Sequence, residues 1–472
     1  MRVHFIGIGG IGVSALARYY LAQGHQVSGS DLVSSEITDA LKKSGAKIFI
    51  GRHKAKNLPK DADLVIYSPA IQKSNPELLK AINYKLKPKS YPEALGELTK
   101  KYFTIAICGS HGKSTVAAMI GLLLVKAGLN PTVILGTKLR EFSDSNFRMG
   151  GLPNTKYKIL NTKYLVIEAD EHFASFLNYW PKIIVLTNLE ADHLDFYKTF
   201  KNYALSFKKF ISRLPKDGIL VANKDDKNIY NNFLAAVKKL LWYFLKQKEA
   251  KKLRKILKVP GEYNVQNALA ALTVARVLKI PDKIAFKALS QFKGSWRRFE
   301  VHKLKLTNNL KPRTCTLISD YAHHPTQIRE TLKAARERFS DRKIWCVFQP
   351  HQYQRTYYLF KDFVKVFKDA LTKKLEVGSL TNFLIDKLII TDIFEVAGRE
   401  NKKIKEKVSS KKLVESIKYK VLSFKKHGDI IYIPKIKEVA RYLKKNLRGG
   451  EVVIVMGAGD VYKLIDLLID KK

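Results

Sequence analysis

Short apolar stretches alternate along the chain with longer segments in which apolar residues recur at helical spacing. Residues 2–6 form one apolar stretch and are followed by a helical pattern at 13–22, and a similar pair occurs at 104–108 and 116–127. Continuous apolar stretches are typical of strands buried on both faces, and strands that alternate with helices form parallel sheets. The pattern therefore predicts an α/β fold.

This alternation continues over the whole chain in three groups. A chain of 472 residues is long enough for several domains with ample core. We place the predicted domains at 1–99, 100–296 and 297–472. Within the second domain, the lysine-rich segment 224–258 is predicted to be helical.

The segment 104–120 sets a glycine-containing loop between a buried strand and a helix. Gly109 and Gly112 allow the loop's backbone N–H groups to turn inward, and the N-terminus of the following helix attracts anionic oxygens. The spacing is GxxGK[ST], which is tighter than the standard phosphate loop, because the first glycine of that loop would fall at Ile107. The segment predicts a phosphate cradle.

The residues that close this loop carry the chemistry of a triphosphate site. Lys113 can neutralise phosphate oxygens, and the hydroxyl group of Ser114 or Thr115 can bind magnesium. An incidental lysine in a glycine-rich turn is the alternative explanation.

Two later strands end in clusters of acidic residues. The strand within 165–171 ends in three carboxylates, which include Glu168, and the strand within 183–197 is followed by acids and by His193. Because parallel strands place their carboxyl ends at one edge of a sheet, these groups should lie beside the phosphate loop. Oxygen donors with one imidazole suit Mg²⁺ or Mn²⁺ better than zinc.

The N-terminal glycines form a second loop, which has the pattern GxGxxG between the strand 2–6 and the helix 13–22. Ser30 and Asp31 end the next strand, and an acid at this distance typically binds a ribose hydroxyl. The motif is typical of dinucleotide-binding oxidoreductases. A nucleotide-sugar diphosphate satisfies the same geometry, so both ligands stay open from these residues alone.

The third domain repeats the arrangement of polar residues after a strand. Asp320, Tyr321 and His323 follow one apolar strand, and His351 and Arg355 follow another. Imidazole and guanidinium groups at two strand ends indicate a second anionic ligand or a carboxylate.

The net charge of +44 raises the alternative of a nucleic-acid-binding protein. The lysines, however, are spread over the whole chain and often stand singly between apolar residues, as on solvated helix faces. We therefore attribute the charge to composition and do not expect a nucleic-acid partner. The positive field still favours anionic substrates such as nucleotides.

The sequence also bears on the compartment. No apolar stretch is long enough to span a membrane, and the N-terminus lacks the plan of a signal peptide. Three cysteines lie in apolar strand-like stretches and form neither a disulfide framework nor a metal-ligand spacing. We expect a cytoplasmic protein without membrane insertion.

Taken together, the motifs resemble the Mur ligases over nearly the full length. The segments that carry the resemblance are GIGGIGVSALA, CGSHGKST, EADE, TNLEADHLDFY, NVQNALAA, RRFE, DYAHHPTQI, FQPHQYQRT and VMGAGD. The resemblance implies a Rossmann-like N-terminal domain that binds a UDP-sugar, a central P-loop-type ATPase domain, and a Rossmann-like C-terminal domain that binds an amino acid.

The implied reaction is ATP-dependent ligation in the cytoplasmic synthesis of peptidoglycan. The carboxylate of UDP-N-acetylmuramate would become an acyl phosphate, and the amine of an amino acid would then displace phosphate. The GIGGIG opening favours L-alanine as the amino acid. A different amino acid or a recycled peptide is the alternative within the family, because Gln352 stands where the family usually has arginine.

The resemblance also implies site residues and a divalent metal, Mg²⁺ or Mn²⁺. Residues expected at ATP are Gly109, Ser110, His111, Gly112, Lys113, Ser114, Thr115, Asn264, Asn267, Arg298 and Asp320. Residues expected at the UDP-sugar are Gly7, Gly9, Gly10, Gly12, Ser30 and Asp31. The amino acid would meet Tyr321, His323, His351 and Arg355. Expected metal ligands are Ser114, Glu168 and His193, and expected catalytic residues are Lys113, His193 and Arg355.

Overall fold

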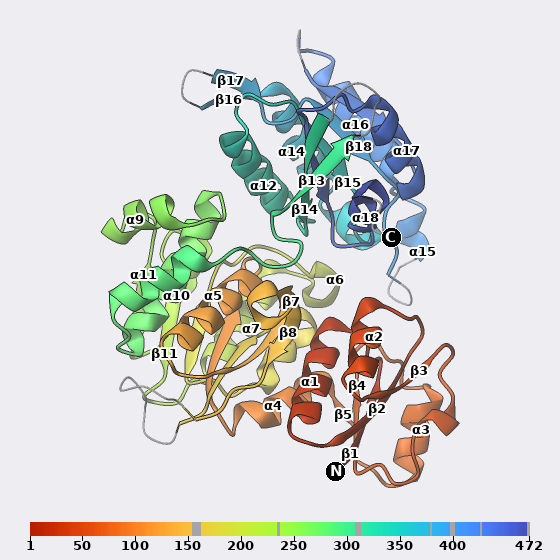
Figure 1. Ribbon diagram of the computed structural model, residues 1–472, viewed down its shortest axis with the longest axis vertical. Helices are drawn as coiled ribbons and strands as arrows, with labels where there is room; N and C mark the ends of the chain where they lie inside the picture. Colours follow the sequence, from red (N-terminus) through yellow and green to blue (C-terminus); the bar gives the residue numbers. More distant parts are fainter. Residues whose placement is uncertain are drawn as a thin grey trace. The chain divides into compact units, whose positions relative to one another are not determined.

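The computed structural model confirms the α/β prediction, with three large sheets that follow one another along the chain (Figure 1). It describes residues 1–152, 162–233, 237–306, 313–377, 380–396, 402–424 and 427–469. The chain divides into two compact units, one of residues 1–258 with 265–295 and the other of 259–264 with 296–472. The first two sheets belong to the first unit and the third sheet to the second.

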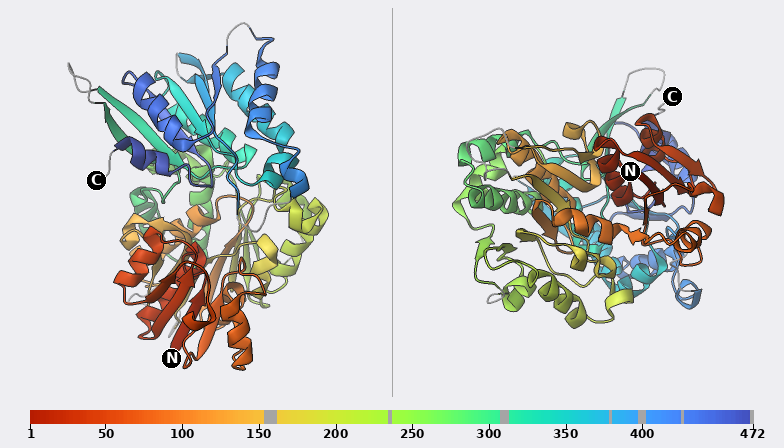
Figure 2. Two further views of the ribbon diagram at one scale, coloured as in Figure 1. Left: turned by 90° about the vertical axis from the view of Figure 1, so that its right-hand side faces the viewer. Right: turned by 90° about the horizontal axis from the view of Figure 1, so that it is seen from below.

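The N-terminal sheet is parallel, in the order β3-β2-β1-β4-β5. Its strands are β1 (Arg2–Ile6), β2 (Gln26–Asp31), β3 (Lys47–Ile50), β4 (Leu64–Tyr67) and β5 (Lys89–Ser90). Its helices are α1 (Ile11–Ala22), α2 (Glu36–Lys43), α3 (Pro76–Asn83) and α4 (Tyr91–Thr99). Helices α1, α2 and α4 contribute to one core cluster and α3 to another, and Figure 2 shows helices on both faces of this sheet.

The central sheet has the order β12-β11-β10-β6-β9-β7-β8, in which only the β7–β8 pair is antiparallel among the described strands. Its strands are β6 (Phe103–Cys108), β7 (Thr132–Leu139), β8 (Ser145–Arg148), β9 (Tyr164–Glu168), β10 (Ile183–Leu186), β11 (Ile219–Asn223) and β12 (Leu240–Tyr243). Because β6 lies between the parallel strands β9 and β10, the segments that follow these three strands leave the sheet at one edge.

Helices flank the central sheet. They are α5 (Lys113–Lys126), α6 (Leu194–Tyr197), α7 (Phe200–Ile211), α8 (Lys227–Phe233), α9 (Lys248–Ile256), α10 (Glu262–Val277) and α11 (Asp282–Gln291), and a 3₁₀ segment, η3 (His172–Asn178), follows β9. Helix α5 packs against β6, β7 and β9 and contacts α11. The helical prediction for 224–258 is wrong at β12, because its apolar residues pair with β11 and extend the sheet.

The third sheet has the order β13-β14-β20-β15-β18-β19 and is parallel except for the β13–β14 pair. Its strands are β13 (Glu300–Leu306), β14 (Arg313–Asp320), β15 (Ile344–Phe348), β18 (Lys387–Ile390), β19 (Asp429–Tyr432) and β20 (Val452–Met456), and β16 (Lys374–Val377) and β17 (Leu380–Phe383) form a separate hairpin. Its helices are α12 (Pro325–Arg338), α13 (Tyr353–Tyr358), α14 (Phe360–Thr372), α15 (Lys402–Lys405), α16 (Ser410–Val421), α17 (Ile436–Asn446) and α18 (Lys463–Ile469).

The N-terminal domain also buries a carboxylate. Glu77 lies in the first turn of α3 and is fully buried. Its Oε2 accepts a hydrogen bond from Ser30 Oγ and lies 2.8 Å from His4 Nε2, and its Oε1 lies 3.0 Å from both Asn57 Nδ2 and His53 Nδ1. Burial alone would raise the pKa of Glu77, but these hydrogen bonds lower it to about 2.

We expect Glu77 to make the stability of the fold depend on pH. Its pKa is depressed on folding, so its contribution is complete above the ordinary value of 4.5 and is lost as the pH falls from there toward 2. The full contribution is on the order of 3 kcal/mol. Urea unfolding between pH 6 and pH 2.5 should show a steeper loss of stability in the wild type than in a Glu77→Gln variant.

Glu97→Gln is the matched control, because the Glu97 side chain is 54% exposed and pairs with Lys89 at the surface. The stability of the Glu97→Gln variant should change with pH as that of the wild type does. If Glu77→Gln and the wild type lost stability in parallel, the buried network would not carry the pH dependence.

Candidate active site

The loop between β6 and α5 depends on two glycines in left-handed conformations. Gly109 has a φ of 129° and Gly112 a φ of 82°. A Cβ at Gly109 would lie 2.2 Å from Thr187 Oγ1, and a Cβ at Gly112 would lie 2.8 Å from Asn267 Oδ1. Any side chain would therefore meet both backbone strain and a steric clash, so the tight loop requires glycine at both positions.

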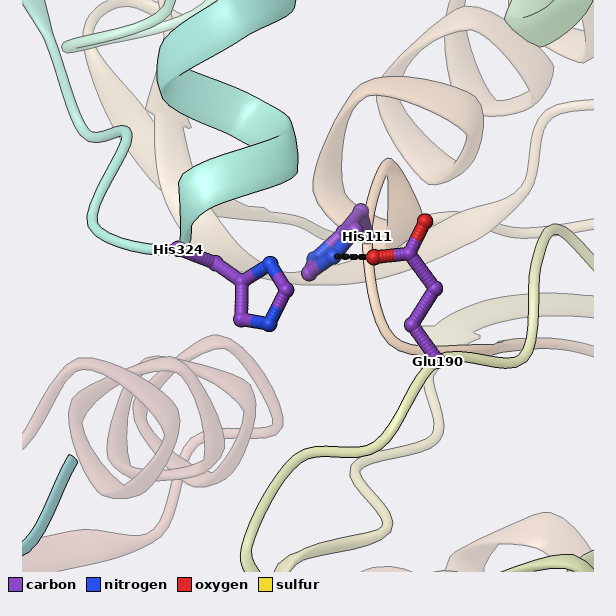
Figure 3. A group of neighbouring side chains, drawn as sticks. All are labelled: His111, Glu190 and His324. Carbon is purple, nitrogen blue, oxygen red and sulfur yellow. Dashed lines mark hydrogen bonds and ion pairs between the residues drawn. The ribbon is translucent and has the colours of Figure 1, made fainter. Parts of the chain in front are cut away.

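The first amide groups of this loop are bound to the segment that follows β10. Ser110 N–H donates to Asn188 O at 3.1 Å, and His111 N–H donates to Asn188 Oδ1 at 2.7 Å. The Ser110 hydroxyl donates to Glu190 O at 2.9 Å. Figure 3 shows His111 Nε2 directed at Glu190 Oε2, 3.2 Å away; His324, also labelled there, begins α12 of the other unit. Ser110 and His111 thus fix the shape of the loop.

The amide groups that are open to an anion are those of the first turn of α5. The first bond of α5 runs from Val116 N–H to Gly112 O at 2.9 Å. The N–H groups of Lys113, Ser114 and Thr115 precede this bond, so they have no partner within the helix. Together with the positive end of the helix dipole, these three groups can bind phosphate oxygens.

Lys113 is held at this point by a buried carboxylate. Its Nζ donates to Glu171 Oε2 at 2.8 Å and Oε1 at 3.0 Å, and to Gly109 O at 2.7 Å. The Glu171 side chain is 1% exposed, and that of Lys113 is 16% exposed. Burial alone would lower the pKa of Lys113, but the carboxylates of Glu171 and Asp170 raise it, so the ammonium group stays charged.

Glu168 ends β9 beside the start of α5. Its Oε2 accepts a hydrogen bond from Ser114 Oγ at 2.8 Å, and its Oε1 accepts one from Gly136 N–H at 2.5 Å. Two of the three predicted metal ligands, Ser114 and Glu168, are therefore in direct contact. A hydroxyl oxygen next to a carboxylate is a donor pair that suits Mg²⁺.

His193, the third predicted metal ligand, belongs to a neighbouring cluster. Its Nε2 lies 3.8 Å from Glu171 Oε1, and one ligand atom each of Asp170, Glu171 and His193 lie within 4.8 Å of one another. The His193 ring stacks on His172 with centroids 4.3 Å apart, which orients the imidazole. The residues present thus fit a divalent cation, with oxygen donors on both sides of Lys113.

The N-terminal glycine loop is built differently. Gly7 N–H and Ile8 N–H both donate to Ser30 O, at 2.8 Å and 3.0 Å, and Gly9 N–H donates to Asp31 Oδ2 at 2.8 Å. The Ser30 hydroxyl points away from the loop into the buried Glu77 network. Ser30 therefore contacts the loop through its backbone carbonyl, and Asp31 contacts it through its side chain.

The two asparagines expected at ATP differ in their surroundings. Asn267 belongs to the first unit, where its side chain lies over Gly112 of the phosphate loop. Asn264 belongs to the second unit, and its Nδ2 donates to Pro260 O at 2.7 Å. This bond holds the turn before α10, as is common for an asparagine near a helix start.

The four predicted amino-acid-binding residues lie together in the second unit. Arg355 Nη1 lies 3.2 Å from His351 Nδ1, and His323 Nδ1 lies 2.9 Å from Tyr321 O. The His323 ring is 5.2 Å from that of Tyr321 and 6.1 Å from that of His351, between ring centroids. The ends of β14 and β15 thus bring two imidazoles, a phenol and a guanidinium into one group.

The two other predicted contacts of this unit have internal partners. Asp320 Oδ2 accepts from Phe299 N–H at 2.7 Å, and its Oδ1 accepts from Ala322 N–H at 2.8 Å. The carboxylate therefore fixes the end of β14. The guanidinium of Arg298 stacks over the Tyr321 ring at 4.7 Å.

Comparison with known proteins agrees with this arrangement. The Mur ligase family catalytic domain matches residues 2–103, the Mur ligase middle domain matches 107–275, and the Mur ligase glutamate ligase domain matches 297–459. The chain belongs to the Mur ligase family. Family membership assigns the GxGxxG loop to a ligase and not to an oxidoreductase.

Individual relatives cover the whole chain. The UDP-N-acetylmuramate–L-alanine ligase of Acetivibrio thermocellus is 38% identical over 100% of this chain and 96% of its own length. The ligase of the same name from Clostridium tetani is 36% identical over 99% of this chain and 98% of its own. The crystal structure of UDP-N-acetylmuramate–alanine ligase from Thermotoga maritima superposes with a TM-score of 0.77 at 26% identity, over 100% of both chains.

Sequence reasoning missed several groups that shape these sites. It placed Glu171 among the acids that support the metal ligands but did not foresee its ion pair with Lys113, and it named Asn188 and Glu190 only as polar residues after a strand. Arg297 is 5% exposed, and its Nη2 donates to Gly457 O and Gly459 O, whereas the sequence reasoning singled out its neighbour Arg298. All of these acids follow an apolar strand in the sequence, so their position alone could not show which of them pairs with Lys113.

We expect Glu171→Gln to destabilise the fold by about 3 kcal/mol, because it leaves the Lys113 ammonium group without its buried counter-charge. Denaturant unfolding measures this change. The double variant Lys113→Met with Glu171→Gln removes both charges and should recover part of the loss. Equal losses in the single and double variants would show that the ion pair is not what stabilises this loop.

Proposed function

We propose that the chain is the ligase that joins L-alanine to the carboxylate of UDP-N-acetylmuramate at the expense of ATP. The observation that carries the proposal is the placement of Lys113 at the N-terminus of α5, between Glu171 and the Ser114–Glu168 pair. The full-length relatives that bear this activity in their names support the choice of substrates. Both nucleotide substrates place the proposed reaction in the cytoplasm, as a step of peptidoglycan synthesis.

The proposed first step joins two anions. The muramate carboxylate attacks the γ-phosphorus of ATP, the bond to the bridging oxygen breaks, and ADP leaves from an acyl phosphate. Because carboxylate and triphosphate repel each other, the site must supply positive charge and hold the two in line. Lys113 and the first-turn N–H groups of α5 supply that charge where phosphate oxygens would lie.

The proposed second step consumes the activated carboxylate. The amine of L-alanine attacks the acyl carbon, inorganic phosphate leaves, and an amide bond forms. In this proposal the group of Tyr321, His323, His351 and Arg355 binds the amino acid, and the guanidinium of Arg355 pairs with its carboxylate. His193 contributes through the metal-ligand cluster described above.

We also propose that the acidic clusters hold Mg²⁺ or Mn²⁺. Ser114 and Glu168 form one donor pair, and His193 lies with Asp170 and Glu171. The metal would screen charge on the phosphate oxygens. The residues of the chain bind the phosphates, neutralise them through Lys113 and orient the muramate carboxylate and the amine of L-alanine.

We also propose that the domain boundaries lie as the sequence predicts, at 1–99, 100–296 and 297–472.

An amino-acid panel tests the substrate assignment. Purified protein with ATP, Mg²⁺ and UDP-N-acetylmuramate should release phosphate when L-alanine is added, at a rate at least about tenfold above that with other amino acids. Gln352 replaces an arginine that is usual in the family, so glycine, L-serine and a tripeptide belong in the panel. Equal phosphate release with several amino acids would contradict the assignment to L-alanine.

Lys113→Ala tests the role of the phosphate loop. We expect turnover to fall by at least about a thousandfold, because the variant removes the charge that faces the triphosphate. UDP-N-acetylmuramate should still bind with wild-type affinity in calorimetry, since the other glycine loop is intact. Loss of both turnover and UDP-N-acetylmuramate binding would mean that the two loops do not form separate sites.

A further inference from the structure

Tyr91 is the first residue of helix α4. Its side chain contacts the N-terminal glycine loop at Gly12, where the loop continues into α1. A Cβ at Gly12 would lie 2.9 Å from Tyr91 Cζ and 3.0 Å from its hydroxyl oxygen. Gly12 lies in the first turn of α1, where a diphosphate on this loop would be bound. The phenol therefore lies directly beside the proposed UDP-sugar site, and Gly12 leaves the space that the ring occupies.

Helix α4 also packs against the segment that follows the acidic end of β9. Burial, together with the carboxylates of Glu168 and Asp170, raises the pKa of Tyr91. Helix α4 contacts α1 and also η3, which follows Asp170. The packing against η3 is close, because a Cβ at Gly96 would lie 2.3 Å from Asn178 O. Tyr91 therefore lies on a helix that contacts both α1, which follows the N-terminal loop, and the segment after β9.

The backbone of Tyr91 is fixed by the start of its helix. Ser90 N–H donates to Glu93 Oε2 at 2.7 Å, and Ser90 Oγ donates to the same oxygen at 2.6 Å. The side chain of Glu93 therefore closes a capping box around the first turn. A phenol on so rigid a helix start can place its hydroxyl group with little loss of conformational entropy.

We propose that the Tyr91 hydroxyl donates a hydrogen bond to the muramoyl part of the UDP-sugar, and so positions its carboxylate for attack on ATP. This inference rests on the proposed function. The substrate has to reach from the loop at Gly12 to the phosphate site at Lys113, and Tyr91 lies beside Gly12 and in the field of Glu168. A neutral hydroxyl donor attracts an anionic substrate there, whereas the neighbouring carboxylates repel it.

Tyr91→Phe tests the proposal, because it keeps the ring against Gly12 and removes only the hydroxyl group. Calorimetry should show that UDP-N-acetylmuramate binds about tenfold more weakly, because one hydrogen bond is lost. Binding of UDP alone should stay within about twofold of the wild type. In the turnover assay, the KM for the UDP-sugar should rise, and the KM values for ATP and L-alanine should not change.

Tyr19→Phe is the matched control. Tyr19 lies on α1, and its hydroxyl is 3.3 Å from that of Tyr102, so the variant loses a hydroxyl contact away from both loops. It should bind both ligands as the wild type does. A thermal melt of both variants checks that the fold is intact.

Three results would overturn the proposal. Unchanged binding of UDP-N-acetylmuramate to Tyr91→Phe would show that the hydroxyl makes no contact with the substrate. Equal weakening of UDP would show that Tyr91 acts on the glycine loop and not on the sugar. Wild-type protein that binds UDP but not UDP-N-acetylmuramate would contradict both this inference and the proposed function. Wild-type protein that binds the UDP-sugar but releases no phosphate with L-alanine would contradict the proposed function alone.

Discussion

The ion pair between Lys113 and the buried Glu171 is the interaction on which the central site depends. A carboxylate that is 1% exposed requires a counter-charge, and Lys113 supplies it at distances of 2.8 Å and 3.0 Å. The pair fixes a cation at the start of α5, where the helix dipole also favours anions. Gly109 and Gly112 leave the space that this arrangement needs, and Asn188 holds the loop by its hydrogen bonds to two backbone amides.

The two glycine loops are held in shape by different sets of hydrogen bonds. In the central loop the N–H groups of Ser110 and His111 bind Asn188, and the first-turn amides of α5 have no partner within the helix. In the N-terminal loop Gly9 N–H is bound by Asp31, and Ser30 O accepts from the two amides before it. The Ser30 hydroxyl is in turn held by Glu77. Each loop is thus held in shape by hydrogen bonds to its own domain, and a loop that is already ordered loses less entropy on binding.

Sequence patterns were most informative where local chemistry decides the structure. The glycine loops after β1 and β6, and the polar groups after β9, β14 and β15, all occur where the apolar stretches end. The patterns were least informative at the edge of the central sheet. Strand β12 lies in a lysine-rich segment whose local preference is helical, and only its pairing with β11 selects the extended form.

The α/β class, the glycine loops and the polar groups at the strand ends could all be predicted from the sequence, because strand–helix periodicity and glycine spacing are local properties. Which of these groups meet depends on the tertiary fold. In the folded chain, Lys113 pairs with Glu171, and Ser114 donates to Glu168. The Ser30 hydroxyl donates to the buried Glu77, and the Tyr91 ring lies against Gly12. These contacts join residues far apart in sequence, so they follow from the order and register of the strands.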